Sequence, residues 1–270
     1  MSIEKSYVIG THEAEIDRLG VQHQVWRSST LDLWREAGLS ERMTAIDVGA
    51  GPGYASRDLV EIVGPSGRLI AVERSHRFVE HMRAKTIGNL PNVEIVEADL
   101  LDFAWPVGVA DFAWCRWVLT FIPEPLRVLE GVAKALKPGG VLAIQEYYDY
   151  GGWHLAPRSQ LFEDYVAKII AKWRATGSEP DVGLELPSLL ETAGLQVESV
   201  RPVVFSARMT DFTARWPNGF AREYLPIMQS DADISAEEAG EIAALLDRYE
   251  RDPNALVITP GVLQVLARKR

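Results

Sequence analysis

The chain has 270 residues, of which 47% are apolar and 24% are charged, and its formal net charge is −10 at pH 7. This composition is typical of a globular protein with a sizeable core, and no apolar run approaches the roughly 18 to 20 residues that a membrane helix needs. Because a negative protein repels phosphate backbones, the charge also argues against a nucleic-acid substrate.

The start of the sequence and its one cysteine point to a cytoplasmic protein. Residues 1–17 are polar and acidic, and they lack the basic flank and apolar stretch of a secretion signal. A single cysteine, Cys115, excludes an internal disulfide and a cysteine-rich zinc site, and it lies in an apolar run typical of a buried strand. We therefore expect a cytoplasmic location and no metal centre.

The predicted elements fall into three parts along the chain. The first 40 residues look mostly helical, and residues 43–147 alternate short β-rich runs with amphipathic segments, the pattern of βαβ units on a parallel sheet. Five strands are expected in that stretch, at 43–49, 68–74, 92–98, 109–118 and 141–148. Beyond residue 150 the pattern predicts helices at 158–175, 186–193, 216–228 and 236–249, and strands at 196–208 and 262–270.

The segment IDVGAGPGYAS, residues 46–56, joins the first strand to the next helix through three glycines. Glycine lets a backbone turn tightly and approach a ligand closely. A dinucleotide turn has the spacing G-x-G-x-x-G with an acid about 20 residues further on, a place that Glu73 could fill. Here the glycines stand at 49, 51 and 53, and Tyr54 takes the place of the third dinucleotide glycine. This spacing disfavours an NAD-dependent oxidoreductase, which stays as an alternative.

Five segments, in chain order, resemble the class I methyltransferases that use S-adenosylmethionine. AIDVGAGPGYA resembles the first motif of that family, LIAVERS the second-strand motif with its acidic end, and VEADLLDF the third-strand segment. DFAWCRWVLTFIPEP and ALKPGGVLAIQEY resemble the fourth and fifth segments, so the likeness covers about residues 43–147. It implies an α/β fold with a doubly wound, seven-stranded, mostly parallel sheet and a helical cap. It also implies three parts: an N-terminal helical lid (1–41), a cofactor-binding core (42–150), and cap helices with the last core strands (151–270).

The resemblance assigns roles to individual residues. The glycine turn would bring its backbone close to the cofactor, Glu73 would accept the two ribose hydroxyls, and Asp99 would accept the adenine amine. Arg74 would lie along the adenine edge, and Gln22 or Arg27 in the lid would reach the methionine moiety. The cofactor-binding residues expected are Gly49, Ala50, Gly51, Glu73, Arg74, Asp99, Leu100, Arg116 and Gln22.

The methyl acceptor is expected beyond the carboxyl ends of the fourth and fifth strands, where ligands of open α/β sheets lie. Arg116 would hold a carboxylate of the cofactor or substrate there, although a structural ion pair is equally open. The aromatic residues after the fifth strand suit a flat, apolar small molecule. If a hydroxyl is methylated, His154 is the candidate catalytic base, with His23 as the other histidine considered.

CRWVLT, residues 115–120, stands where enzymes that methylate base amines carry an asparagine-proline-proline-aromatic motif. The absence of that motif and the net negative charge of the chain both disfavour DNA and RNA as substrates. We therefore expect a methyltransferase for a small, aromatic or natural-product-like molecule, with no nucleic-acid or membrane partner. The sequence leaves open whether the protein forms a homodimer, and whether it binds S-adenosylmethionine without turning it over.

Overall fold

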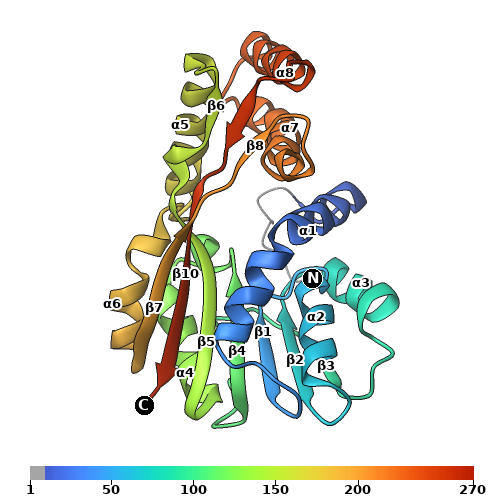
Figure 1. Cartoon of the computed structure of the whole chain (residues 1–270), viewed down its shortest axis with the longest axis vertical. Coiled ribbons are helices and arrows are strands. Elements are labelled where there is room, and N and C mark those ends of the chain that lie inside the picture. The colour runs from blue at the N-terminus through green and yellow to red at the C-terminus, as the bar shows by residue number, and fades with distance from the viewer. Residues whose placement is uncertain (1–9) are drawn as a thin grey trace.

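A seven-stranded sheet forms the base of the computed structural model, which describes residues 10–270 (Figure 1). Its strand order is β3-β2-β1-β4-β5-β10-β7, and β10 runs antiparallel to both of its neighbours while the other pairs are parallel. The strands are β1 (Thr44–Val48), β2 (Arg68–Glu73), β3 (Val93–Glu97), β4 (Ala110–Arg116), β5 (Leu136–Asp149), β7 (Leu195–Val203) and β10 (Gly261–Lys269). This architecture confirms the predicted doubly wound, mostly parallel fold.

Helices cover both faces of the sheet. On one face lie α2 (Tyr54–Val63), α3 (His76–His81) and the last turns of α1 (Glu13–Glu36), and on the other lie α4 (Pro125–Ala135) and α6 (Leu186–Thr192). Local sequence sets where these helices begin: Ser75 accepts a hydrogen bond from the backbone of Phe78 to cap α3, and Pro125 occupies the first turn of α4. Short helical turns connect the larger elements, namely η1 (Met82–Thr86), η2 (Leu119–Phe121), η3 (Tyr150–Gly152), η4 (Val182–Leu184) and η5 (Phe212–Ala214).

A cap stands on the sheet at the carboxyl ends of β4 and β5 (Figure 1). It contains α5 (Gln160–Ala175), α7 (Arg215–Ser230) and α8 (Ala236–Arg251) around a small sheet of order β6-β9-β8. The strands of that sheet are β6 (His154–Ala156), β9 (Leu256–Ile258) and β8 (Ser206–Arg208). The four helices predicted beyond residue 150 are present, whereas this second sheet was not predicted.

The strand expected at 196–208 is in fact two strands in two sheets. β7 ends at Val203 on the core sheet, and β8 begins at Ser206 in the cap, where it pairs with β9. The break falls at residues 204–205, which lack a glycine or proline that would have marked it in the sequence. Beside it, the backbone N–H of Thr259 donates to the carbonyl of Phe205 at 2.9 Å, and the N–H of Phe205 donates to Thr259 Oγ1 at 3.0 Å.

Helix α1 packs on both layers. Leu33 and Trp34 near its end belong to the hydrophobic core between sheet and α2, whereas Trp26 belongs to the core of the cap. Trp26 is fully buried and meets Phe205 and Trp216 at ring-centre distances of 4.6 and 5.0 Å. The helix therefore lies across the junction of core and cap. The division into lid, core and cap stays a prediction, and residues 1–9 of the lid lie outside the described residues.

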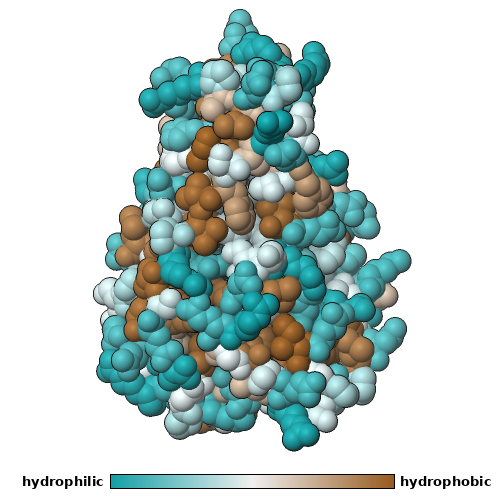
Figure 2. Space-filling view, in the orientation of Figure 1, coloured by the Kyte–Doolittle hydropathy of each residue, from teal (hydrophilic) through white to brown (hydrophobic). Residues whose placement is uncertain are grey.

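Polar side chains cover much of the face seen in Figure 2, with apolar residues interspersed among them. Among residues 10–270, no helix is both long enough and apolar enough to cross a membrane. In the same part of the chain, no three histidine, cysteine or acidic side chains are grouped closely enough to hold a metal ion. Cys115 is buried, and this burial raises the pKa of its thiol well above the ordinary value.

Candidate active site

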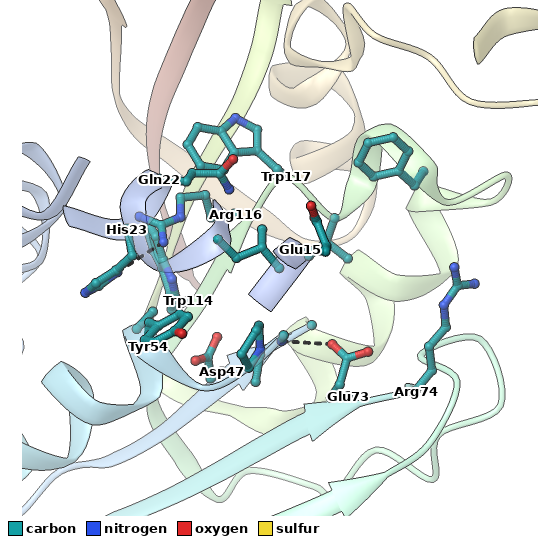
Figure 3. Close-up of a pocket in the computed structure, with 18 of the residues that line it drawn as sticks. Glu15, Gln22, His23, Asp47, Tyr54, Glu73, Arg74, Trp114, Arg116 and Trp117 are labelled. Atoms are coloured by element: carbon teal, nitrogen blue, oxygen red, sulfur yellow. Dashed lines mark hydrogen bonds between the residues drawn. The ribbon is translucent and has the colours of Figure 1, made fainter. Parts of the chain in front are cut away.

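One cavity opens at the carboxyl ends of the parallel strands, between the glycine turn, α1 and the base of the cap (Figure 3). Its walls come from segments far apart in the sequence, because strand ends that are distant along the chain meet at one edge of a parallel sheet. All nine residues predicted to bind the cofactor line it: Gly49, Ala50, Gly51, Glu73, Arg74, Asp99, Leu100, Arg116 and Gln22. The structure thus brings together the whole predicted set.

Glu73 ends β2 with its carboxylate beside the glycine turn (Figure 3). One oxygen accepts the backbone N–H of Gly51 and the other accepts that of Ser75, both at 2.8 Å. The side chain is only 2% exposed, and burial raises the pKa of its carboxyl. The backbone N–H of Arg74 also contributes to holding the carboxylate, and since a carboxylate offers about four acceptor positions, capacity for a further donor remains. That geometry matches a pair of neighbouring hydroxyls.

The glycine turn depends on backbone that other residues rarely adopt. Gly49, Gly51 and Gly53 have φ values of 71°, 56° and 88°, all in the left-handed region. A Cβ on Gly49 would also stand 2.5 Å from Val118 Cγ2, so the loop after β4 packs directly on the turn. The three glycines therefore permit the conformation, and Gly49 also permits this close approach.

Asp47 orders the turn and also faces the cavity (Figure 3). One of its oxygens accepts the hydroxyl of Ser56 at 2.6 Å, which ties β1 to the first turn of α2. The side chain is 2% exposed, and burial raises the pKa of its carboxyl to about 6. The carboxylate is consequently mostly ionised at pH 7 and largely protonated at pH 5.

A hydrogen-bonded chain runs from α2 through α1 to Arg116 at the end of β4. Asp58 accepts from Arg27 at 2.8 and 3.0 Å and contacts His23 Nε2 at 3.2 Å. The other ring nitrogen of His23, Nδ1, lies 3.3 Å from an Arg116 N–H, and a second Arg116 nitrogen donates to Thr30 at 3.2 Å. This chain holds Arg116 against the cavity.

The same series of hydrogen bonds also fixes the protonation state of His23. Burial lowers the pKa of its imidazole, and only a neutral ring with its proton on Nε2 can donate to Asp58 while accepting from Arg116. Both nitrogens are thereby engaged, which makes His23 an orienting group for Arg116 and leaves it no free lone pair for a substrate. Burial also lowers the pKa of Arg116, to about 10, so the guanidinium remains charged at neutral pH.

Gln22 is held with its amide in one orientation. Its oxygen accepts from Arg18 at 3.1 Å and from the Trp216 indole at 3.0 Å, so α1, α7 and the cavity wall meet at this group. Among the described residues its amide nitrogen has no partner, and this nitrogen can donate to a ligand. A methionine carboxylate would accept such a donor, as the sequence suggested.

The loop after β4 is shaped by a buried acid. Glu146 accepts the backbone N–H groups of Val118 and Leu119, both at 2.7 Å, and the hydroxyl of Thr120 at 2.9 Å. Burial raises the pKa of Glu146 to about 7. Within this loop Trp117 has a φ of 51°, which is a strained value for a tryptophan. Such strain persists where the surroundings determine the conformation, and it is common at functional sites.

Aromatic rings form the cap side of the cavity. Trp117, Phe121 and Tyr147 come from the carboxyl ends of β4 and β5, and Phe220 comes from α7. The Trp117 and Tyr147 rings are stacked with centres 5.6 Å apart. Phe220 was not predicted, because nothing local in the sequence links residue 220 to a strand end more than 70 positions earlier.

The N-terminal helix adds an ion pair that sequence reasoning also missed. Arg18 donates two hydrogen bonds to Glu15, at 2.6 and 2.8 Å, and both side chains line the cavity. They are 9% and 3% exposed, so this is a buried, bidentate pair. Its i, i+3 spacing in α1 is visible in the sequence, but such pairs are ordinary on helix surfaces.

His154 lies apart from the other predicted residues. It stands on β6 in the cap, where its Nδ1 is 3.5 Å from a carboxylate oxygen of Glu163, and it is not among the residues that line the cavity. The chain crosses from the core sheet into the cap between Asp149 and His154, which carries the histidine away from the strand ends. Its role as catalytic base stays a prediction that the cavity geometry does not use.

Comparison with known proteins agrees with this site. Residues 46–144 match the family model described as "Methyltransferase domain", a stretch that contains the glycine turn, Glu73, Asp99 and Arg116. Residues 46–144 are therefore a methyltransferase domain of class I. S-adenosylmethionine is the methyl donor of that family, so the expected cofactor is confirmed and the dinucleotide alternative is set aside.

Relatives match this chain over different lengths. A 37.1 kDa protein in transposon TN4556 of Streptomyces fradiae is 31% identical over 219 residues, which cover 76% of this chain and 61% of the relative. Trans-aconitate 2-methyltransferase of an Azoarcus strain is 34% identical over 119 residues, which cover 44% of this chain and 45% of that enzyme. The chain thus spans only about half the length of the curated relatives it matches.

A solved structure shows the same fold over almost the whole chain. The structure of a candidate methyltransferase from Bacillus halodurans covers 90% of this chain and 99% of its own, with a TM-score of 0.61 at 17% identity. The cap is therefore part of an architecture found elsewhere.

Proposed function

We propose that this protein transfers the methyl group of S-adenosylmethionine to a small, aromatic or natural-product-like molecule. The observation that supports this most is the single cavity shared by the predicted cofactor residues and an aromatic wall. Glu73 and the glycine turn line the part of the cavity that would hold the cofactor, the cofactor half. Trp117, Phe121 and Phe220 line the part that would hold the methyl acceptor, the acceptor half. A protein that only binds the cofactor would have no need of the second half.

The residues present fit the cofactor chemically. Glu73 offers a carboxylate that can accept ribose hydroxyls beside the backbone N–H groups that already bond to it. Asp47 and Arg116 offer opposite charges at the cavity for the ammonium and carboxylate of the methionine moiety. Asp99 and Leu100 line the same cavity on the β3 side, where the adenine would lie.

Methyl transfer depends more on the alignment of the two reactants than on a strong acid or base in the protein. S-adenosylmethionine supplies an activated methyl group, and the reaction is an in-line displacement at carbon with a neutral sulfide leaving. The protein has to hold the acceptor atom behind the methyl carbon and keep water out, for which proximity alone can supply about 7 to 11 kcal/mol of the barrier. The aromatic wall and the helix α1 above it provide that enclosure.

We also propose that α1 acts as the lid expected from the sequence. Its Arg27 and His23 both bond to Asp58 of α2, and its Trp26 is buried in the cap. These contacts hold α1 across the cavity while leaving Glu15, Arg18 and Gln22 facing into it.

Two measurements test the proposal. Titration calorimetry with S-adenosylmethionine, S-adenosylhomocysteine and NAD, as a control dinucleotide, should show binding of the first two and none of the third. Incubation with S-adenosylmethionine and a panel of small phenols and polyketide-like molecules should then produce S-adenosylhomocysteine. Absence of binding of both methionine derivatives refutes the proposal, and binding without turnover across the panel favours a non-catalytic protein.

A further inference from the structure

The hydroxyl of Tyr147 is a polar group with no partner at the acceptor half of the cavity. The residue is 7% exposed, its hydroxyl has no hydrogen bond within the described part of the chain, and it lines the cavity. The residue is largely buried, but its hydroxyl oxygen is not fully enclosed, so it can pair with a polar group of a ligand in the cavity.

The Tyr147 ring is held firmly, which fixes the direction of its hydroxyl. Trp117 is stacked against one side with ring centres 5.6 Å apart, and Tyr150 meets it edge-on at 4.9 Å. Trp117 is itself stacked against Trp216 at 5.5 Å, so the array continues into α7. A ring fixed in this way presents its hydroxyl at one position at little entropic cost.

The hydroxyl is suited to donate a hydrogen bond. Burial raises the pKa of Tyr147 far above neutral, so the O–H stays protonated and does not act as a base. An oxygen on the acceptor can receive this hydrogen bond. The neighbouring rings Phe121 and Phe220 would then contact an apolar body attached to that oxygen.

The charges that line the cavity favour an acceptor without charge. Three arginines and four carboxylates line it, which leaves a formal charge of −1: Arg18, Arg74, Arg116, Glu15, Asp47, Glu73 and Asp99. His23 adds no charge, since burial lowers its pKa. S-adenosylmethionine carries a sulfonium, an ammonium and a carboxylate, so its net charge of +1 cancels the remaining charge. Nothing is left to neutralise a carboxylate or an ammonium on the acceptor, and an unpaired charge in such a site is costly.

We propose that Tyr147 binds the oxygen of an uncharged, phenol-like acceptor, and that carboxylates are excluded from the same position. This inference rests on the proposed function and narrows its substrate class. It separates this protein from a relative such as trans-aconitate 2-methyltransferase, whose name denotes a carboxylate substrate. Tyr147 is in this view a residue that binds and selects the acceptor.

The test uses three probes of one shape on the full chain. 2-Naphthol carries a neutral hydroxyl at pH 7, 2-naphthoate carries a carboxylate, and naphthalene carries no polar group. Each is titrated by its own fluorescence into protein saturated with sinefungin, an analogue whose ammonium takes the place of the sulfonium. Tyr147→Phe removes the hydroxyl and keeps the ring, and Tyr148→Phe, on the next residue of β5 and outside the cavity lining, is the matched control.

We expect 2-naphthol to bind wild-type protein at least tenfold more tightly than 2-naphthoate. Tyr147→Phe should weaken 2-naphthol about 5- to 10-fold, the effect of one hydrogen bond, and should leave naphthalene unchanged. Tyr148→Phe should change neither. Equal or tighter binding of 2-naphthoate, an unaltered 2-naphthol affinity in Tyr147→Phe, or no binding of 2-naphthol overturns the inference. Sinefungin affinity is measured first, and its absence would instead refute the proposed function.

Discussion

Replacing Glu73 by alanine should weaken binding of S-adenosylhomocysteine by about 2 to 3 kcal/mol. The carboxylate already accepts the backbone N–H of Gly51 on one oxygen and that of Ser75 on the other, both at 2.8 Å, and its open acceptor positions can take ribose hydroxyls. Hydrogen bonds to a charged group contribute about 1.5 to 3 kcal/mol, and the two would share one carboxylate, so their sum is not additive. With 1.4 kcal/mol per tenfold change, the dissociation constant should rise roughly 30- to 150-fold.

Titration calorimetry measures this change, and a neighbouring acid provides the control. Glu97 stands opposite Glu73 in the β2–β3 register, but it is exposed and pairs with His76 outside the cavity. Glu97→Ala should therefore leave the affinity within twofold. Because Glu73→Ala also strands the N–H groups of Gly51 and Ser75, thermal unfolding must confirm that the variant is folded at the assay temperature. A folded variant with wild-type affinity would refute the ribose assignment.

Three further predictions concern the same cavity. Since the pKa of Asp47 is raised to about 6, the affinity for S-adenosylmethionine should fall about tenfold from pH 7 to pH 5. Asp47→Asn should remove this pH dependence in calorimetry, and a variant that keeps the wild-type pH dependence contradicts the prediction. Burial lowers the folded-state pKa of His23, so its stabilising effect is complete above about pH 6.5 and is lost as pH falls below that value. Urea unfolding of His23→Gln should accordingly vary less between pH 7 and 5 than that of wild type. Gly49→Ala would place a side chain on left-handed backbone and against Val118, so it should lower the free energy of unfolding in urea by roughly 2 to 5 kcal/mol. Gly51→Ala has the same backbone strain but its added methyl meets no atom, so it should lower that free energy by only about 1 to 2 kcal/mol. Equal losses in the two variants would refute the packing argument.

The sequence predicted the core, and the residues that it proposed for the cofactor meet in one cavity, because their signals are local. The glycine turn, Glu73 and Asp99 each follow directly on an apolar strand, and the ends of parallel strands meet at one edge without any need to know the rest of the fold. Even the conformation of the turn was foreseeable, since the glycines that permit left-handed backbone are visible as letters.

The acceptor half was predictable only in outline. Phe220 and the Glu15–Arg18 pair reach the cavity through the packing of α7 and α1, which depends on contacts between distant segments. The strands of the cap sheet are three residues long, too short for a periodic pattern to show. His154 was placed by its nearness in sequence to β5, and the crossing into the cap separates it from the cavity.

The chain crosses four times between the two sheets, once through α5 and α6 and three times through short connections, and these short connections restrict how the protein can admit a ligand. β5 leads into β6, β7 into β8 and β9 into β10, each through at most four residues, and the last two crossings are joined by hydrogen bonds between Phe205 and Thr259. Because three short connections join the cap to the core sheet, the cap cannot rotate about a single hinge, and the two keep their mutual orientation. The other wall of the cavity is α1, which connects to β1 through residues 37–43, and it is the wall that would have to move to open the cavity. With the lid role proposed above for α1, the cofactor would enter and leave when the helix that carries Gln22 and His23 moves away, and the rate of turnover would depend on how often it does so.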